Sequence, residues 1–270
     1  MIIKWSLPSV YWYSRRTDSL QRLDCSTGPV TSLAMVETSD IMLAVGSSLG
    51  DLIIFQIPKP VITDIGVSFP GTVQNIQEFS IKDVHTAAVS ALAWAKNGER
   101  LFSGDTAGTL VMSVVDFFIN TVQTSFLSRQ ETEVVSLSYQ DKLLLVSSLS
   151  GSFLVDLSQG EAMRRSVDGS SKAGLGSCLL QEGVGRSSLK CLLLGQGDTV
   201  AVSDLDGNTE RSLMFHEALR RQHTQIPLLN PISIARDEEA NCGNILVLSH
   251  EKQTAVMWSK VGIVFRIKGD

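Results

Sequence analysis

The sequence predicts an all-β protein, and three observations support this prediction. Short runs of alternating or continuous apolar residues recur along the 270 residues. Turn signals such as Asn97-Gly98 and Asp206-Gly207 separate these runs, because both pairs tolerate the backbone angles of tight hairpins. The same order of strands and turns returns at intervals of roughly 40 to 60 residues, which favours repeated β units over a helical solenoid.

The clearest unit runs from Val84 to Val115. Turns are expected at Asn97-Gly98 and at Gly104–Gly108, where glycine closes the loop. The three strands expected around these turns are Val89–Trp94, Arg100–Ser103 and Thr109–Val115. One such unit cannot bury both of its faces, so it requires neighbouring copies.

Weaker copies of this unit fill the rest of the chain. Val30–Leu33 repeats the first strand and Ile41–Gly50 repeats the second strand with its turn. Val134–Leu137 and Leu143–Gly151 are the same two landmarks in a third copy. We therefore predict a single β-propeller domain over residues 1–270, with a partial blade at 1–28 and blades at 29–80, 84–128, 133–167, 173–220 and 228–270.

The two ends of this pattern and one internal stretch are less regular. Met1–Trp5 opens directly in strand-like sequence, so we expect a propeller of about five blades plus a partial first blade, incomplete at one or both ends. Glu210–Arg221 has apolar residues at helical spacing and is expected to form a short amphipathic helix between blades. Asn244–Ile267 returns to strand-like sequence and completes the last blade.

Composition excludes several classes of function. The net charge is −5 and the arginine pairs are isolated, which argues against nucleic-acid binding, since that affinity comes mostly from phosphate neutralisation. The four cysteines form no C-x-x-C pair, so we expect buried thiols in a reduced cytoplasmic protein and no zinc. No apolar run reaches the length of about 20 residues that a membrane helix needs, and any membrane association is expected to occur through partners.

No catalytic, cofactor-binding or metal-binding residues emerge from the motifs, so we expect no enzyme and no cofactor. His216-Glu217 begins like a zinc-protease motif, but Arg220 stands where the second histidine is required. The glycine pairs lack the third glycine of a dinucleotide site, and no nucleophile elbow is present. Trp258–Val261 fits an aromatic-x-x-aliphatic motif that binds ubiquitin-like modifiers, but it has no acidic neighbours and lies in an expected strand.

Four side chains of the repeat pattern are expected to have structural roles. We predict that Asp105 caps a turn and that Trp94 and Trp258 pack between blades. We predict that His85 lies at the surface or at the start of a strand, with a structural hydrogen bond to Ser90 as the alternative.

The segment from His85 to Thr109 resembles a WD40 repeat, with two departures from the family pattern. Ser113-Val114 stands where the family has Trp-Asp, and Ala107 stands where the family has an aspartate before the turn glycine. The resemblance implies a buried network of histidine, serine, tryptophan and aspartate. We therefore predict that His85 and Ser90 lack two partners of this network and that the blade is held mainly by packing.

The whole chain resembles the amino-terminal propellers of the family that includes tectonin β-propeller repeat-containing protein 2 and the Hermansky–Pudlak syndrome 5 protein. Three copies carry this resemblance, at Ala44–Gly50, Val89–Asp105 and Val135–Leu149, together with Val256–Phe265 near the end. It implies a non-enzymatic scaffold for autophagy, endolysosomal or lysosome-related-organelle trafficking, cytoplasmic or peripheral on endosomal or autophagic membranes. The partners implied are other proteins of those complexes, and the partner-binding residues are unknown. The alternative is a generic WD40 adaptor in a ubiquitin-ligase or signalling assembly.

Overall fold

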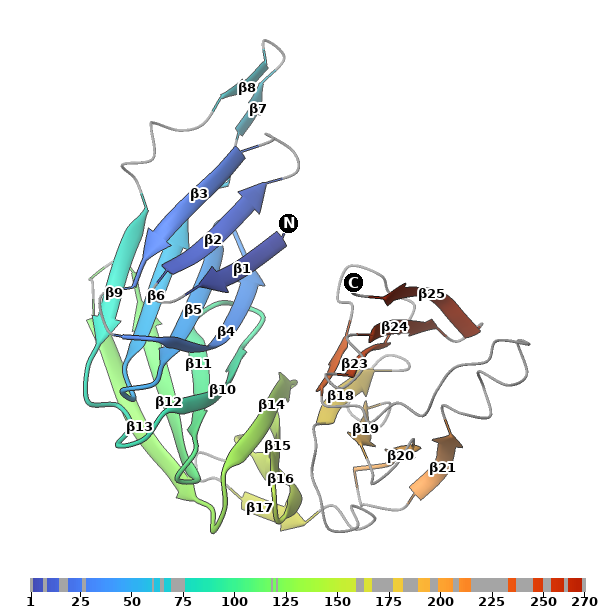
Figure 1. Cartoon of the computed structure of the whole chain (residues 1–270). Coiled ribbons are helices and arrows are strands. Elements are labelled where there is room, and N and C mark those ends of the chain that lie inside the picture. Colours follow the sequence, from blue (N-terminus) through green and yellow to red (C-terminus); the bar gives the residue numbers. More distant parts are fainter. Residues whose placement is uncertain are drawn as a thin grey trace. The chain divides into compact units, whose positions relative to one another are not determined.

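The computed structural model consists of antiparallel β-sheets (Figure 1). It describes residues 2–6, 9–14, 19–25, 28–59, 61–63, 66–68, 76–117, 119, 121–158, 163–166, 177–181, 189–194, 199–205, 209–214, 233–236, 245–249, 254–259 and 262–268. None of these residues forms a helix that could cross a membrane. The chain divides into two compact units, Met1–Glu133 and Val134–Asp270, and each unit is described by itself.

The described residues of the first unit form three sheets of three or four strands, and the strands of each sheet lie side by side in chain order. The sheets are β1 (Ile2–Ser6), β2 (Ser9–Ser14) and β3 (Ser19–Asp24); β4 (Val30–Glu37), β5 (Ile41–Ser47), β6 (Leu52–Ile57) and β9 (Gln77–Ile81); and β10 (Val89–Trp94), β11 (Arg100–Asp105), β12 (Thr109–Asp116) and β13 (Thr121–Arg129). A separate hairpin of β7 (Val61–Thr63) and β8 (Gly66–Ser68) belongs to the connection between β6 and β9.

The second unit repeats the four-stranded arrangement. Its sheets are β14 (Val134–Gln140), β15 (Leu143–Ser148), β16 (Gly151–Asp156) and β17 (Met163–Ser166); β18 (Ser177–Gln181), β19 (Leu189–Leu194), β20 (Thr199–Ser203) and β21 (Thr209–Met214); and β22 (Ser233–Arg236), β23 (Ile245–Ser249), β24 (Thr254–Ser259) and β25 (Gly262–Lys268). Each sheet runs from its first to its last strand in sequence order, so short hairpins make all of the connections within a sheet.

The sheets of the first unit stack through alternating side chains. The residues of β5 are buried throughout, because one face meets the preceding sheet and the other meets the following sheet. Leu43 lies in the apolar cluster that includes Trp12 of β2, and the adjacent Ala44 lies in the cluster that includes Trp94 and Leu101. Fully burying a large aliphatic side chain contributes about 1.5–3 kcal/mol, so these two interfaces hold the unit together.

A β-bulge marks the same position in three sheets. The ladder shifts register between Val30 and Ser32, between Val89 and Ala91, and between Val134 and Ser136. Each bulge therefore lies at the start of the first strand of its sheet. Bulges re-aim backbone groups and are specific structural features, so their recurrence shows that these sheets are copies of one unit.

The structure confirms the all-β class and corrects the helix expected at Glu210–Arg221. Residues Thr209–Met214 form β21, which pairs with β20 from Thr199 opposite Met214 to Ser203 opposite Thr209. The backbone ladder satisfies donors and acceptors that a short isolated helix would leave partly open, and such helices are marginal in water. Phe215–Arg221 and the motif at His216-Glu217 lie outside the described residues.

Candidate functional site

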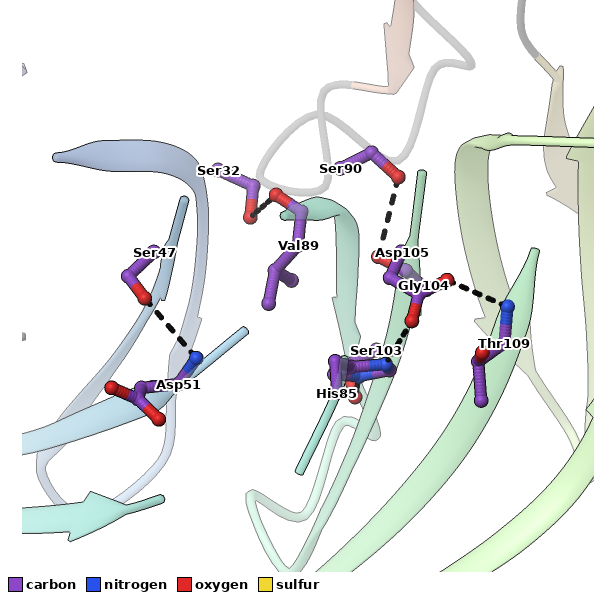
Figure 2. Close-up of polar contacts among 10 residues, drawn as sticks. All are labelled: Ser32, Ser47, Asp51, His85, Val89, Ser90, Ser103, Gly104, Asp105 and Thr109. Carbon is purple, nitrogen blue, oxygen red and sulfur yellow. Dashed lines mark hydrogen bonds and ion pairs between the residues drawn. The ribbon is translucent and has the colours of Figure 1, made fainter. Parts of the chain in front are cut away.

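A buried network of polar side chains occupies one end of the sheet β10–β13 (Figure 2). His85, in the loop before β10, places its Nδ1 atom 3.0 Å from Oδ2 of Asp105 and its Nε2 atom 2.8 Å from Oγ of Ser103. A carboxylate only accepts hydrogen bonds, so in the neutral ring Nδ1 carries the proton and Nε2 accepts from the serine hydroxyl. The network ties the loop to the second strand of its sheet.

The backbone of β11 brings the two partners of His85 together. Ser103 and Asp105 are two residues apart in the strand and therefore point to the same face. The second oxygen of Asp105 accepts a 2.7 Å hydrogen bond from the backbone amide of Thr109 and so closes the turn between β11 and β12. The prediction that Asp105 caps a turn is confirmed.

The loop that carries His85 is also held by the preceding sheet. The backbone amide of His85 donates to the carbonyl of Gly50, at 3.1 Å, in the turn between β5 and β6. Ser32 of β4 donates from its hydroxyl to the carbonyl of Val89, which lies at the bulge of β10 (Figure 2). Backbone and side-chain hydrogen bonds therefore cross between the two sheets at the end where the network lies.

The network has the serine, histidine and aspartate of a catalytic triad. Its residues are buried, however, whereas a catalytic triad must be accessible to a substrate. The relative exposure is 0% for Ser103 and Asp105 and 4% for His85. A triad serine must reach a substrate carbonyl, and this serine is sealed within the protein. Burial lowers the pKa of the His85 imidazole, against the opposite effect of Asp105, so the ring is held in its neutral form. The geometry fits a structural network that fixes a turn.

His85 lies just before a strand, as one of the two predicted positions requires, but the predicted surface position is wrong. His85 is buried and bonds to Ser103 and Asp105, whereas the hydroxyl of Ser90 donates to the carbonyl of Gly104, at 3.3 Å. The prediction that the network lacks its aspartate is also wrong. The carboxylate comes from Asp105, at the end of β11, and not from position 107.

The missing tryptophan of the repeat pattern is a real departure. Ser113 takes that position in β12, is fully buried, and its Oγ atom has no hydrogen-bond partner. The predicted packing role of Trp94 is confirmed, because its ring lies in the cluster shared by two sheets and its Nε1 donates to the carbonyl of Ala34 in β4. The side chain of Trp258 lies outside the described residues.

In two other sheets, a serine takes the position that Asp105 has at the end of the second strand. In the turn between β5 and β6, Oγ of Ser47 accepts from the backbone amides of Leu49 and Asp51, at 3.2 and 3.1 Å. In the second unit, the equivalent residue is Ser148, opposite Val134; its Oγ lies 2.9 Å from Oγ of Ser150 and donates to the carbonyl of Gly151, at 3.0 Å. The polar chemistry varies between copies, while the turn position is kept.

Elsewhere, the described residues show neither a metal-binding cluster nor an activated thiol. They contain no group of three or more histidine, cysteine or acidic side chains that could hold a metal ion. Cys25 and Cys191 are buried free thiols, and burial raises their pKa to about 11 and about 12. Thiols with raised pKa values are poor nucleophiles at neutral pH, because little thiolate forms.

Comparison with known proteins gives distant relatives and a shared fold. No protein-family model matches the sequence. WD repeat-containing protein CG11141 of Drosophila melanogaster is 29% identical over 231 residues, which cover 82% of this chain and 32% of that protein. Tectonin beta-propeller repeat-containing protein 2 of Homo sapiens is 24% identical over 216 residues, which cover 79% of this chain and 15% of that protein. The chain thus spans well under two thirds of either relative.

Two solved structures share the fold. A chain in the crystal structure of the mitotic checkpoint complex matches with a TM-score of 0.67 and 14% identity, over 99% of this chain and 76% of that chain. The β-propeller domain of Myceliophteria thermophila Cps50 (Swd1) matches with a TM-score of 0.62 and 11% identity, over 89% and 72%. These structures support the predicted β-propeller class.

Proposed function

We propose that this chain, which is a WD-repeat β-propeller, is a non-enzymatic scaffold that binds other proteins in autophagy or endolysosomal trafficking, including trafficking to lysosome-related organelles. The observation that carries the trafficking role is the similarity to tectonin beta-propeller repeat-containing protein 2 over 79% of the chain. The same proposal places the protein in the cytoplasm, or on endosomal or autophagic membranes through its partners.

The chemistry of the site supports a scaffold without catalysis. The serine, histidine and aspartate of the buried network use their polar groups in hydrogen bonds that hold a turn. A buried neutral histidine and a sealed serine stabilise the sheet but offer nothing to a substrate in solution. Two of these turns present an apolar side chain to solvent: Leu49 is 66% exposed and Leu149 is 48% exposed.

Proximity labelling in cells with the chain fused to a labelling enzyme tests the proposal. We expect enrichment of autophagy or endolysosomal trafficking proteins over a propeller of similar size from an unrelated pathway. The matched variant Leu49→Asp alters an exposed turn without touching the core, and a loss of enriched partners would map binding to that end of the first unit.

The outcomes separate the candidate functions. Enrichment of autophagy proteins would favour the autophagy branch, and enrichment of components of lysosome-related organelles would favour the other branch. Recovery of cullin-type ubiquitin ligase subunits without trafficking proteins would contradict the proposal and favour a generic WD40 adaptor.

A further inference from the structure

The outer strand β13 has a free edge. It pairs with β12 on one side, and within the described residues no other strand pairs with it. A strand at the edge of a sheet presents unpaired backbone donors and acceptors that another strand can use. Natural proteins usually protect such edges with charged residues, proline or a cover.

Charge protection is missing from most of β13. Its nine residues include one charge, Arg129, at the very end of the strand. The other outer strands carry charges nearer to their centres or in pairs: Arg22 and Asp24 in β3, Glu78 in β9, Arg164 and Arg165 in β17, Glu210 and Arg211 in β21, and Arg266 and Lys268 in β25. Pairing of β9, β17 or β25 with itself would bring like charges together, whereas pairing of β13 with itself would not.

Two exposed side chains on one face of β13, Thr124 and Phe126, are open to a partner. Val122, Thr124 and Phe126 lie opposite Val115, Ser113 and Val111 of β12, so they share one face of the sheet. Thr124 is exposed, whereas Val122 is half-buried because it packs against the apolar cluster that includes Trp94 and Leu101. The Phe126 ring is 65% exposed, which is unusual for a large apolar side chain in a strand.

The regular stretch of β13 ends at a bulge. The ladder shifts between Leu110, which lies opposite Ser128, and Val111, which lies opposite Phe126. Leu127 is therefore the extra residue, and a new strand can pair in regular register with Thr121–Phe126 alone.

We propose that β13 pairs antiparallel with β13 of a second copy of this chain, with Thr124 at the two-fold axis. In this register Val122 lies opposite Phe126 of the second copy, and Gln123 lies opposite Ser125 of the second copy. An aromatic ring beside a β-branched side chain and two facing threonines are favourable cross-strand pairs. The contact is isologous, as the commonest homodimers are, and it does not depend on the proposed trafficking function.

The size of the contact limits its strength. A single pair of short strands buries much less than the roughly 1,600 Å² of a standard protein interface. The dimer is therefore weak and depends on concentration, so that the chain is a monomer when dilute and a dimer when locally concentrated. A scaffold with this property becomes bivalent where it accumulates.

Sedimentation equilibrium of the whole chain, from about 1 to about 200 μM, tests the proposal. We expect a reversible monomer–dimer equilibrium in wild type. The variant Thr124→Lys places two ammonium groups opposite each other at the axis and should weaken dimerisation roughly tenfold or more. Ser80→Lys, at an exposed position of the outer strand β9, is the matched control and should leave the equilibrium unchanged.

A charge-swap mixture identifies the edge directly. Thr124→Lys and Thr124→Glu should each be monomeric, and mixing them should restore a heterodimer because the facing charges then attract. A dimer that survives both substitutions, or a mixture that stays monomeric, would overturn the proposal. A wild-type chain that is monomeric at every concentration would also overturn it and would leave the edge to an extended segment of another protein.

Discussion

Two turns of the first unit have the same backbone and different side-chain chemistry. The turn between β5 and β6 runs from Ser47 to Asp51, and the turn between β11 and β12 runs from Asp105 to Thr109. In each, the last residue donates its amide to the side chain of the first, and a glycine with positive φ comes one position earlier. In the second turn the capping group also binds a buried histidine.

Backbone geometry therefore specifies both turns. The hydrogen bond to the buried histidine is an additional feature of the turn between β11 and β12. Ser47 closes its turn with one hydroxyl that accepts two amides. Asp105 closes its turn and also compensates the buried imidazole of His85, so its loss leaves more groups without partners. The two turns should therefore respond alike to changes in the backbone and differently to loss of the cap.

The largest difference should follow from removing the caps. Asp105→Ala leaves the Nδ1–H of His85 and the amide of Thr109 without their acceptor in a buried site, and should lower the free energy of unfolding by about 3–4 kcal/mol. Ser47→Ala should cost about 1 kcal/mol, since the amides it serves are partly exposed. Urea unfolding of the two variants measures both values. Equal losses would show that the histidine network adds nothing to the turn.

The glycines should give similar losses in both turns. A Cβ atom at Gly50 would lie 2.2 Å from the carbonyl oxygen of His85, and one at Gly108 would lie 2.5 Å from that of Gln130. Both glycines also have φ near +90°, which L-residues rarely adopt. We expect Gly50→Ala and Gly108→Ala each to cost about 2 kcal/mol.

A third glycine provides the control for this pair. Gly98 also has positive φ, but the nearest atoms to its Cβ position belong to the Thr38 and Met42 side chains, at 3.0 Å or more. Gly98→Ala should therefore cost about 1 kcal/mol in the same urea unfolding experiment. A larger loss at Gly98 than at Gly50 and Gly108 would contradict the role of the close backbone approach.

The network should also make stability depend on pH, whereas the serine-capped turn should not. Burial lowers the pKa of His85 in the folded protein below the value of about 6.5 in the unfolded chain. Between the two values the unfolded chain binds a proton that the folded chain does not, so stability falls as the pH falls below about 6.5. The loss should approach about 1.4 kcal/mol per pH unit.

The measurement compares unfolding of wild type and His85→Gln at about pH 7.5 and about pH 5.5. The variant should be less stable at the higher pH and should lose less stability on acidification, because the buried titrating group is gone. A wild-type protein that loses no more stability than the variant on acidification would contradict a buried neutral histidine.

Much of this comparison could be predicted from the sequence, because local patterns determine strands and turns. The expected strand Val89–Trp94 is β10, and the two turn glycines were placed in equivalent turns from their spacing alone. The prediction of a helix from Glu210 was wrong, because a short stripe of apolar residues does not reveal that β20 is available to pair with this segment. The hairpin β7–β8 and the recurrent bulges depend on pairing between strands, which periodicity does not describe.

The candidate site was less accessible to sequence reasoning. The family pattern places the carboxylate at position 107, where this chain has alanine, so the sequence predicts a network without its aspartate; the strand geometry brings Asp105 to His85 instead. The signal that could have found it was the spacing of Ser103 and Asp105, which puts both side chains on one face of a strand. The partners of a buried histidine are set by how its loop packs on a strand. The sequence does not show which strand residues that packing brings within hydrogen-bond distance.

The smallest effect should come from the position where the repeat pattern has tryptophan. The hydroxyl of Ser113 is fully buried without a hydrogen-bond partner, so its desolvation is not compensated. Ser113→Ala removes that group and nearly preserves the shape, and should raise the free energy of unfolding by up to about 1 kcal/mol. Thermal and urea unfolding measure the change, with Ser103→Ala as the control that should destabilise, since the Ser103 hydroxyl bonds to His85. A loss of stability in Ser113→Ala would contradict an uncompensated hydroxyl at this position.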